Sequence, residues 1–128
     1  MRMERDRPAE GPLVRGFGAA GFKVDAPDGT IGIYPALLLT AARADNWTPP
    51  PLAELDEAAV ASLFVPEIEF LLLGTGANLH LPPRALVRAL EARGIGVEAM
   101  DSRAAARAWG VLRAEGRRVA AALYPLGT

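Results

Sequence analysis

The sequence predicts an α/β protein whose sheet is mixed. In the second half of the chain, three short apolar stretches alternate with two amphipathic ones, which is the order strand–helix–strand–helix–strand. In the first half, short apolar runs are separated by turn residues without helical spacing, which indicates extra strands. The length of 128 residues suits one domain. We expect residues 14–128 to form this domain and residues 1–13, which are rich in charge and proline, to form a disordered tail.

The second half contains the clearest elements. Buried strands are expected over residues 68–73, 95–100 and 119–124. Two prolines, Pro82 and Pro83, suit the first turn of a helix, because that turn leaves its N–H groups unpaired in any case. This spacing implies at least one right-handed strand–helix–strand unit.

A second helix follows the strand over 95–100. Its N-cap is Asp101 or Ser102, and Gly116 ends it. Gly110 lies in its interior, where glycine costs about 1 kcal/mol relative to alanine. We therefore expect Gly110 to permit close packing or a kink.

The first half reads as strands joined by turns. Strands are expected over 22–24, 30–34 and 36–40, with turn chemistry at 25–29. The proline-rich residues 47–51 predict a rigid extended loop. Apolar residues at helical spacing then predict one helix over 52–63.

Composition excludes several classes of function. The chain has no cysteine and one histidine, His80, so thiolate metal sites, disulfides and cysteine nucleophiles are excluded and no metal site or cofactor is expected. No apolar run approaches the roughly 20 residues of a membrane span. The first residues also lack the apolar core of a signal peptide, so a cytoplasmic location is expected.

The net charge of −1 conceals an asymmetry along the chain. Residues 25–69 carry eight acids and one base, whereas residues 84–118 carry eight arginines and four acids. Aromatic residues are only 6% of the chain, so the basic segment lacks the interleaved rings typical of nucleic-acid binding. This polarity favours a protein partner over nucleic acid.

The strongest local feature is a glycine-rich turn, Gly74-Thr75-Gly76, at the expected carboxyl end of a strand. Ligands of α/β proteins prefer this edge, and glycine lets the backbone approach a phosphate. Asp101 follows 25 residues after Gly76, where a dinucleotide fold places its ribose-binding acid, but it serves equally as a helix cap. The third glycine of the dinucleotide motif is absent, since Leu79 occupies its place.

Three more residues are candidates for ligand binding. Arg107 could point at the same edge and hold an anion or a carboxylate, and Arg117 follows the end of the same helix. The alternative for both is a solvated helix surface. Trp47 is either a lid on the core or an interaction anchor. His80 could act as a general base, but no partner is near it in sequence, so no residue is assigned a catalytic role.

Three ordered segments together resemble a known family. They are GFG at 16–18 with YPALLL at 34–39 and Trp47; PE at 66–67 with LLLGTG at 71–76; and GIGVEAMDS at 94–102 with Arg107 and EGRRVAAAL at 115–123. The chain resembles the domain-of-unknown-function family that includes mitochondrial complex I assembly factor 3 and many uncharacterised bacterial and archaeal single-domain proteins. The likeness spans nearly the whole chain from about residue 14.

The resemblance implies a three-layer domain with a central mixed sheet, helices and an additional β-layer. It also implies no established enzymatic activity, since the eukaryotic relatives act in assembling a respiratory complex. One run departs from the family, which tends to show Cys-Arg-Thr-Tyr-Asn where this chain has ARAWG at 106–110. A role that depends on that thiol or amide would be lost here.

Three hypotheses about function follow. The first is a non-enzymatic binding or assembly-type factor with a site near Gly74–Gly76, Arg107 and Trp47 that contacts a protein partner. The second is a domain that binds a small anionic ligand or nucleotide, or an enzyme acting on a small molecule, through the same loop. The third is an interaction module that forms a homo-oligomer through an exposed strand or the proline-rich loop.

Overall fold

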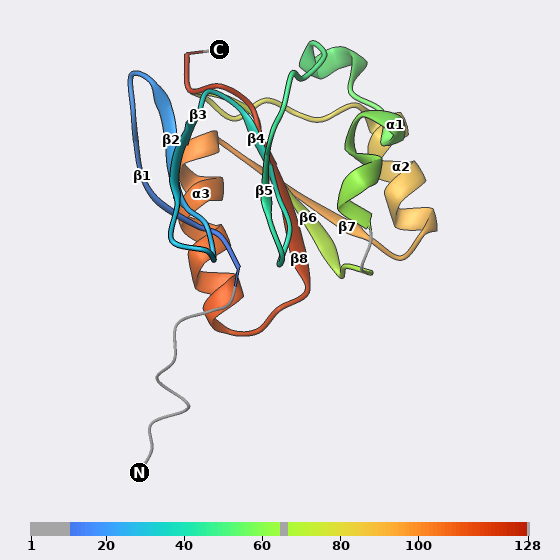
Figure 1. Cartoon of the computed structure of the whole chain (residues 1–128). Coiled ribbons are helices and arrows are strands. Elements are labelled where there is room, and N and C mark those ends of the chain that lie inside the picture. Colours follow the sequence, from blue (N-terminus) through green and yellow to red (C-terminus); the bar gives the residue numbers. More distant parts are fainter. Residues whose placement is uncertain (1–10, 65–66, 128) are drawn as a thin grey trace.

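In the part of the chain that the structure describes, two β-sheets and three α-helices form the fold (Figure 1). The structure is a computed structural model, and it describes residues 11–64 and 67–127. The expectation of a disordered tail over residues 1–10 lies outside the described residues. Leu13 of that expected tail opens the first strand.

The larger sheet has five strands in the order β5-β4-β8-β6-β7. Strand β6 runs parallel to β7 and β8, whereas β4 runs antiparallel to β8 and β5. The mixed sheet predicted from the sequence is therefore confirmed. The bounds of its strands are β4 Leu37–Leu39, β5 Ala44–Asn46, β6 Phe70–Gly74, β7 Gly96–Met100 and β8 Val119–Leu123.

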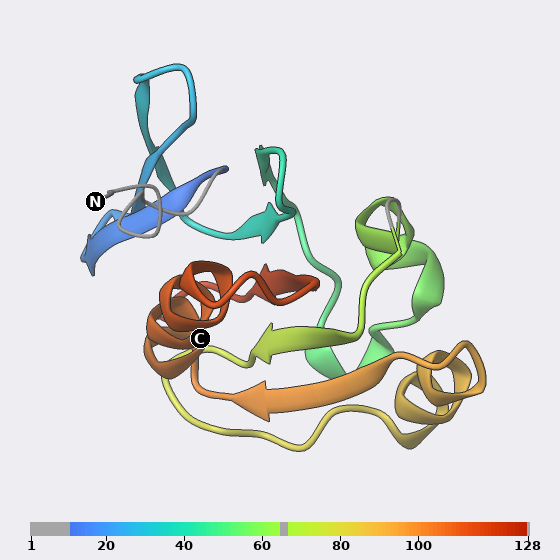
Figure 2. The ribbon, with the colours of Figure 1, turned by 90° about the horizontal axis from the view of Figure 1, so that it is seen from below.

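The two crossover helices pack on opposite faces of this sheet, as Figures 1 and 2 show. Helix α2, Arg84–Ala92, lies with the short helix α1, Glu57–Val60, on one face. Helix α3, Ser102–Ala114, lies on the other face. On this second face the antiparallel sheet of β1 Leu13–Gly18, β2 Gly21–Asp25 and β3 Ile31–Tyr34 forms the additional β-layer. The three-layer α/β fold is confirmed.

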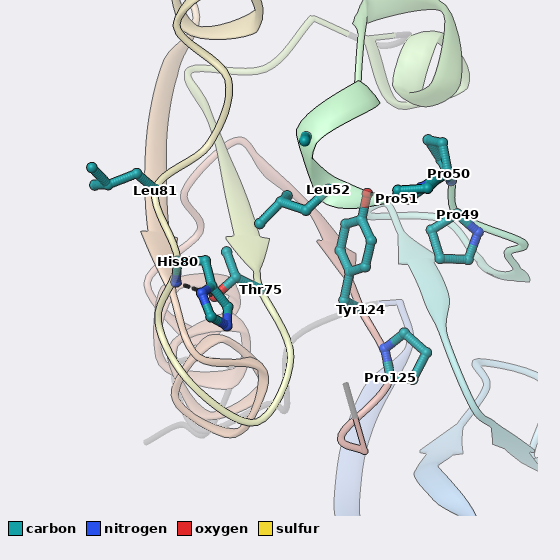
Figure 3. Close-up of a pocket in the computed structure, with 10 residues that line it drawn as sticks. Pro49, Pro50, Pro51, Leu52, Thr75, His80, Leu81, Tyr124 and Pro125 are labelled. Atoms are coloured by element: carbon teal, nitrogen blue, oxygen red, sulfur yellow. Dashed lines mark hydrogen bonds between the residues drawn. The ribbon is translucent and has the colours of Figure 1, made fainter.

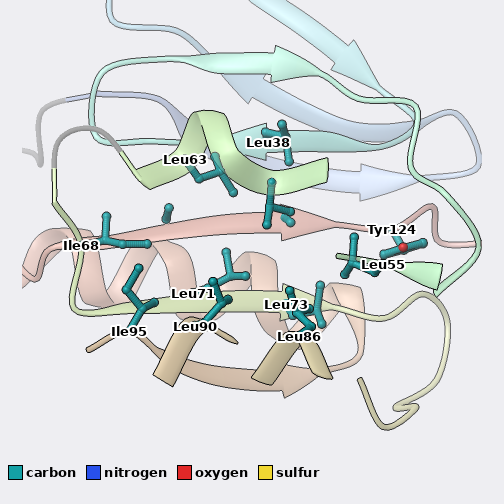
Figure 4. Close-up of a cluster of buried hydrophobic side chains, with 13 residues drawn as sticks. Leu38, Leu55, Leu63, Ile68, Leu71, Leu73, Leu86, Leu90, Ile95 and Tyr124 are labelled. Carbon is teal, nitrogen blue, oxygen red and sulfur yellow. The ribbon is translucent and has the colours of Figure 1, made fainter. Parts of the chain in front are cut away.

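The core divides into two clusters because side chains alternate along each central strand. Leu71 and Leu73 of β6 point into the cluster under α2, with Leu86 and Leu90 (Figure 4). Leu72, between them, points into the cluster under α3 with the fully buried Trp109. Strands buried on both faces appear as continuous apolar runs, which is why their sequences lack alternation.

The predicted helix over 52–63 is wrong as a single element. The segment forms two 3-10 turns, η2 Leu52–Glu54 and η3 Ala61–Phe64, on either side of α1. Leu55 is extended, with φ −65° and ψ 129°, and the side chain of Asp56 accepts a hydrogen bond from the Ala59 N–H. An extended residue followed by an N-cap starts a new helix, which helical spacing alone does not reveal.

The close packing expected at Gly110 is also wrong, and the kink expected as its alternative stays a prediction. A Cβ at this position would meet no atom within 4 Å, so no close packing requires the glycine. The cap of α3 is Asp101, whose carboxylate accepts from the Ala104 N–H at 2.9 Å.

Candidate functional site

Gly74 is the point where β6 meets the first turn of α3. A Cβ at Gly74 would lie 2.8 Å from both the Ser102 Oγ and the Leu123 Cδ2. Real Cβ atoms do not approach this closely, so the glycine lets the helix start directly against the strand end. The glycine serves packing between α3 and the sheet.

Ser102 ties the loop after β6 to the end of β8. Its buried Oγ accepts a hydrogen bond from the Gly76 N–H at 2.9 Å and donates one to the Tyr124 carbonyl at 2.8 Å. The Ser102 N–H donates in turn to the Gly76 carbonyl at 2.8 Å. Gly76 has φ +108°, a region that favours glycine. Its backbone is therefore bonded within the protein.

Thr75 is bonded in the same way. Its buried hydroxyl donates to the Asn78 carbonyl at 2.7 Å and accepts from the His80 N–H at 3.0 Å, and its own N–H donates to the Met100 carbonyl at 2.9 Å. The N–H groups of Thr75 and Gly76 are thus committed to internal bonds. A phosphate-cradling loop needs such groups directed at the ligand.

A hollow of about 690 Å³ opens beside this loop, and we call it the proline hollow. In Figure 3, Thr75 and His80 lie on one side and the prolines and Tyr124 on the other, with Leu52 between them. Its wall is mostly apolar, and the described residues that line it include no aspartate, glutamate, lysine or arginine. The lining residues are Pro49, Pro50, Pro51, Leu52, Ala53, Thr75, His80, Leu81, Tyr124 and Pro125.

Tyr124 fixes the proline side of the hollow. Its hydroxyl donates to the Pro50 carbonyl at 2.7 Å, and burial raises its pKa to about 12. The ring of Trp47 packs edge-on against it, with centroids 5.1 Å apart. This aromatic pair holds the proline segment against the end of β8.

The structure brings two of the predicted parts of the site together and leaves two elsewhere. Thr75 lines the hollow, and Trp47 supports it through Tyr124. Arg107 lies over the ring of Phe17 in β1, at 5.3 Å from its centroid. It therefore faces the three-stranded sheet.

Arg117 lies beside the start of β6, at the opposite end of the strand from the Gly74 loop. It donates to the Glu69 carboxylate at 3.1 Å and stacks over Phe70 at 5.3 Å. Hydrogen bonds from Arg117 and from the Arg118 N–H hold the pKa of Glu69 below its ordinary value. These contacts give Arg117 a structural role between β6 and β8.

Sequence reasoning missed most of the hollow's wall. The sequence predicts the prolines as a rigid loop and offers that loop as a contact between copies of the chain, not as the wall of a hollow, and it does not single out Leu81. Leu81 is 86% exposed, an unusual position for a large apolar side chain beside an apolar hollow. The signal in the sequence is the LHL run at 79–81 directly before two prolines, since both leucines are exposed.

Among residues 11–64 and 67–127, no group of three or more histidine, aspartate or glutamate side chains could hold a metal ion. No helix within the same ranges is long and apolar enough to cross a membrane.

The five-stranded mixed sheet has one crossover helix on each face and an added three-stranded sheet on one side. This arrangement makes the chain a three-layer α/β protein. The chain belongs to the family described as "Protein of unknown function (DUF498/DUF598)", whose model matches residues 14–124. An uncharacterised protein of Rhodobacter capsulatus is 39% identical over 90 residues, which are 70% of this chain and 68% of that protein.

Several solved structures are similar to this chain in both fold and sequence. A protein from Bordetella parapertussis is 32% identical, with a TM-score of 0.77 over 93% of this chain and 99% of that one. A protein from Bordetella pertussis, described as a Mth938-like domain, is 33% identical, with a TM-score of 0.64 over 90% of this chain and 86% of that one. The predicted family membership is therefore confirmed.

Proposed function

We propose that this protein is a non-enzymatic binding factor of the assembly type, and that the proline hollow takes an uncharged, apolar segment of a protein partner. One observation carries the proposal: an open apolar hollow of about 690 Å³ lies beside a leucine that is 86% exposed. Burying Leu81 and the hollow's wall would contribute about 25 cal/mol for each Å² of apolar surface removed from water.

The lining residues decide the chemistry of the occupant. No aspartate, glutamate, lysine or arginine lies among these lining residues, so a charged ligand would lose water without gaining a counter-charge. The three consecutive prolines are conformationally restricted, so little backbone entropy is lost when a partner packs on them. Both features favour an apolar segment.

The same residues support a role without catalysis. The Thr75 hydroxyl is engaged by Asn78 and His80, and the Tyr124 hydroxyl by Pro50. General acid–base chemistry needs a titratable group aimed at a reacting atom, with a partner that orients it. No carboxylate lies among the lining residues of the hollow to orient His80.

The family resemblance seen in the sequence supports the assembly role, since that family includes mitochondrial complex I assembly factor 3. The alternative, a small anionic ligand or nucleotide at Gly74–Gly76, has less support because the N–H groups of Thr75 and Gly76 are bonded internally. A thermal shift with adenine nucleotides that Gly76→Val removes would revive that alternative.

The proposal is tested by comparing three forms of the chain as bait in cell lysate at low and moderate salt. We expect the wild type and Val111→Glu to retain the same proteins, and Leu81→Glu to lose them. Val111 is the matched control, because it is an apolar residue of α3 that is 59% exposed. Equal retention by Leu81→Glu and the wild type would contradict the proposal.

A further inference from the structure

Strand β3, outside the proline hollow, is an unpaired edge of the three-stranded sheet. The strand order β1-β2-β3 leaves one side of Ile31–Tyr34 without a neighbouring strand. In Figure 2 the tip of the β2–β3 hairpin extends away from the five-stranded sheet. Two large apolar side chains on this strand, Ile31 and Ile33, are 61% and 59% exposed.

The hydrogen-bonding phase of the hairpin determines which backbone groups reach the free edge. The Ala26 N–H donates to the Thr30 carbonyl at 2.9 Å, and the register pairs Val24 with Gly32. Bonded and non-bonded pairs alternate along an antiparallel ladder, so Gly32 bonds to β2. The N–H and C=O groups of Ile31 and Ile33 therefore point toward the free edge.

Apart from its short length of four residues, this edge lacks the features by which sheet proteins block edge-to-edge pairing. Natural edge strands carry proline, an inward-pointing charge or a bulge, and lysine is the commonest blocking residue. The sequence IGIY at 31–34 has no charged residue and no proline. The register of β3 on β2 is also unbroken over Phe22–Asp25, without a bulge.

The free edge of β3 can pair with the same edge of a second copy of the chain, about a two-fold axis beside Gly32. Antiparallel pairing of two copies would set Ile31 opposite the partner's Ile33, and Ile33 opposite the partner's Ile31. Each pair exchanges two backbone hydrogen bonds, which gives four across the interface. The side chains of all four isoleucines then lie on one face, because they share the phase of the strand.

We propose that two copies of this chain pair through β3 to form a continuous six-stranded antiparallel sheet. The charges on β2 do not oppose this pairing. Lys23 is in register with Ile33 and Asp25 with Ile31, so the β2 and β3 part of each row across the dimer carries one lysine and one aspartate. Asp25 is already paired with Arg15 of β1 at 2.7 Å, so the pairing is carried by the free backbone groups and the isoleucines. The interface is small, so the dimer is weak and depends on concentration.

Sedimentation of the full chain from about 10 to about 1,000 μM tests the pairing, since this range covers the affinities of small interfaces. We expect the mean mass of the wild type to rise from that of one chain, 13.5 kDa, toward twice that value. Ile33→Lys should stay at the mass of one chain, because it sets lysines at the interface. Val111→Lys and Leu81→Glu should follow the wild type. A wild type that stays monomeric throughout, or an Ile33→Lys variant that dimerises equally, overturns the proposal.

Amide hydrogen exchange of the unmodified chain keeps the test valid if Ile33→Lys fails to fold. The N–H groups of Ile31 and Ile33 should exchange more slowly at the high concentration than at the low one. The Gly32 N–H, already bonded to β2, should change far less. Equal exchange of Ile31 and Ile33 at both concentrations contradicts pairing through β3, even where the mass rises.

Discussion

Ser102 shows how one buried hydroxyl can organise the end of a sheet. It is fully buried and bonds both to Gly76 after β6 and to Tyr124 after β8. In the sequence, Ser102 was one of two candidate caps, and Asp101 fulfils that role. The linking role was invisible because Gly76 and Tyr124 lie 26 and 22 residues away along the chain.

We predict that Ser102→Ala lowers the free energy of unfolding by about 1–3 kcal/mol, because it leaves a buried N–H and a buried carbonyl without this partner. Urea unfolding measures the loss. Ser62→Ala is the control, since Ser62 is exposed. A change no larger than that of the control would mean that Ser102 does not tie these segments together.

A substitution at Gly110 is predicted to raise the free energy of unfolding, whereas Ser102→Ala lowers it. Nothing lies within 4 Å of a Cβ added there, so Gly110→Ala should stabilise the protein by up to about 1 kcal/mol through helix propensity. Gly116→Ala should destabilise it instead, because Gly116 has φ +75°. Thermal unfolding of both variants checks the signs. Destabilisation by Gly110→Ala would show that the position is more crowded than the structure describes.

At the scale of elements, apolar periodicity in the sequence predicted the strands and helices of the second half of the chain. It failed for strands that form only because tertiary contacts stabilise them. The strands and helices from β6 to β8 have strong apolar patterns and clear end signals. Strand β5 has the sequence Ala44–Asn46, which has no strand-like pattern, and it forms because β4 offers an edge for pairing. Strand β1 contains two glycines and also has no clear strand-like pattern, so it was not among the expected strands; it forms by pairing with β2.

The proline segment 49–51 is held in place by contacts with residues outside the segment. Tyr124 donates to the Pro50 carbonyl, and Trp47 packs on the same ring. This anchoring joins a loop of the first half to the last strand, so it shapes the hollow. The sequence predicted the rigid loop and could not show what it packs against.

The Tyr124 hydroxyl makes the stability of this contact depend on pH. Burial raises its pKa from 10.0 to about 12, so the folded state holds the phenol proton where the unfolded state releases it. The stabilisation is fully present below pH 10 and is lost as the pH rises toward 12. Urea midpoints from pH 9 to 12 should fall more steeply for the wild type than for Tyr124→Phe. Parallel profiles would show that this hydroxyl is not buried against Pro50.

At the scale of the whole molecule, part of the charge asymmetry of the sequence is satisfied by ion pairs within the fold. Acids of the first half pair with arginines of the second half, as in Glu57 with Arg93 at 2.5 Å and Glu69 with Arg117 at 3.1 Å. On this asymmetry the sequence favoured a protein partner over nucleic acid, and the ion pairs account for part of the asymmetry. The proposed partner contact at the proline hollow uses none of these charged side chains.

The candidate site was predictable only in part. The strand end at Gly74–Gly76 was found because parallel strands place ligands at their carboxyl edge. Arg107 was expected there, but the phase of α3 turns it toward Phe17. The hollow itself arises where residues 49–53, 75–81 and 124–125 meet, and no local pattern encodes that meeting.

The measurement that tests the account most directly is site-specific photo-crosslinking in cells that express the chain. Leu81 and, separately, Val111 would be replaced by p-benzoylphenylalanine, and crosslinked peptides would be sequenced. We predict that position 81 captures an uncharged, apolar segment of another protein, that Tyr124→Ala weakens this capture, and that position 111 does not capture that segment. Crosslinks at position 81 no more frequent than at position 111, or crosslinks to charged segments, would contradict the account.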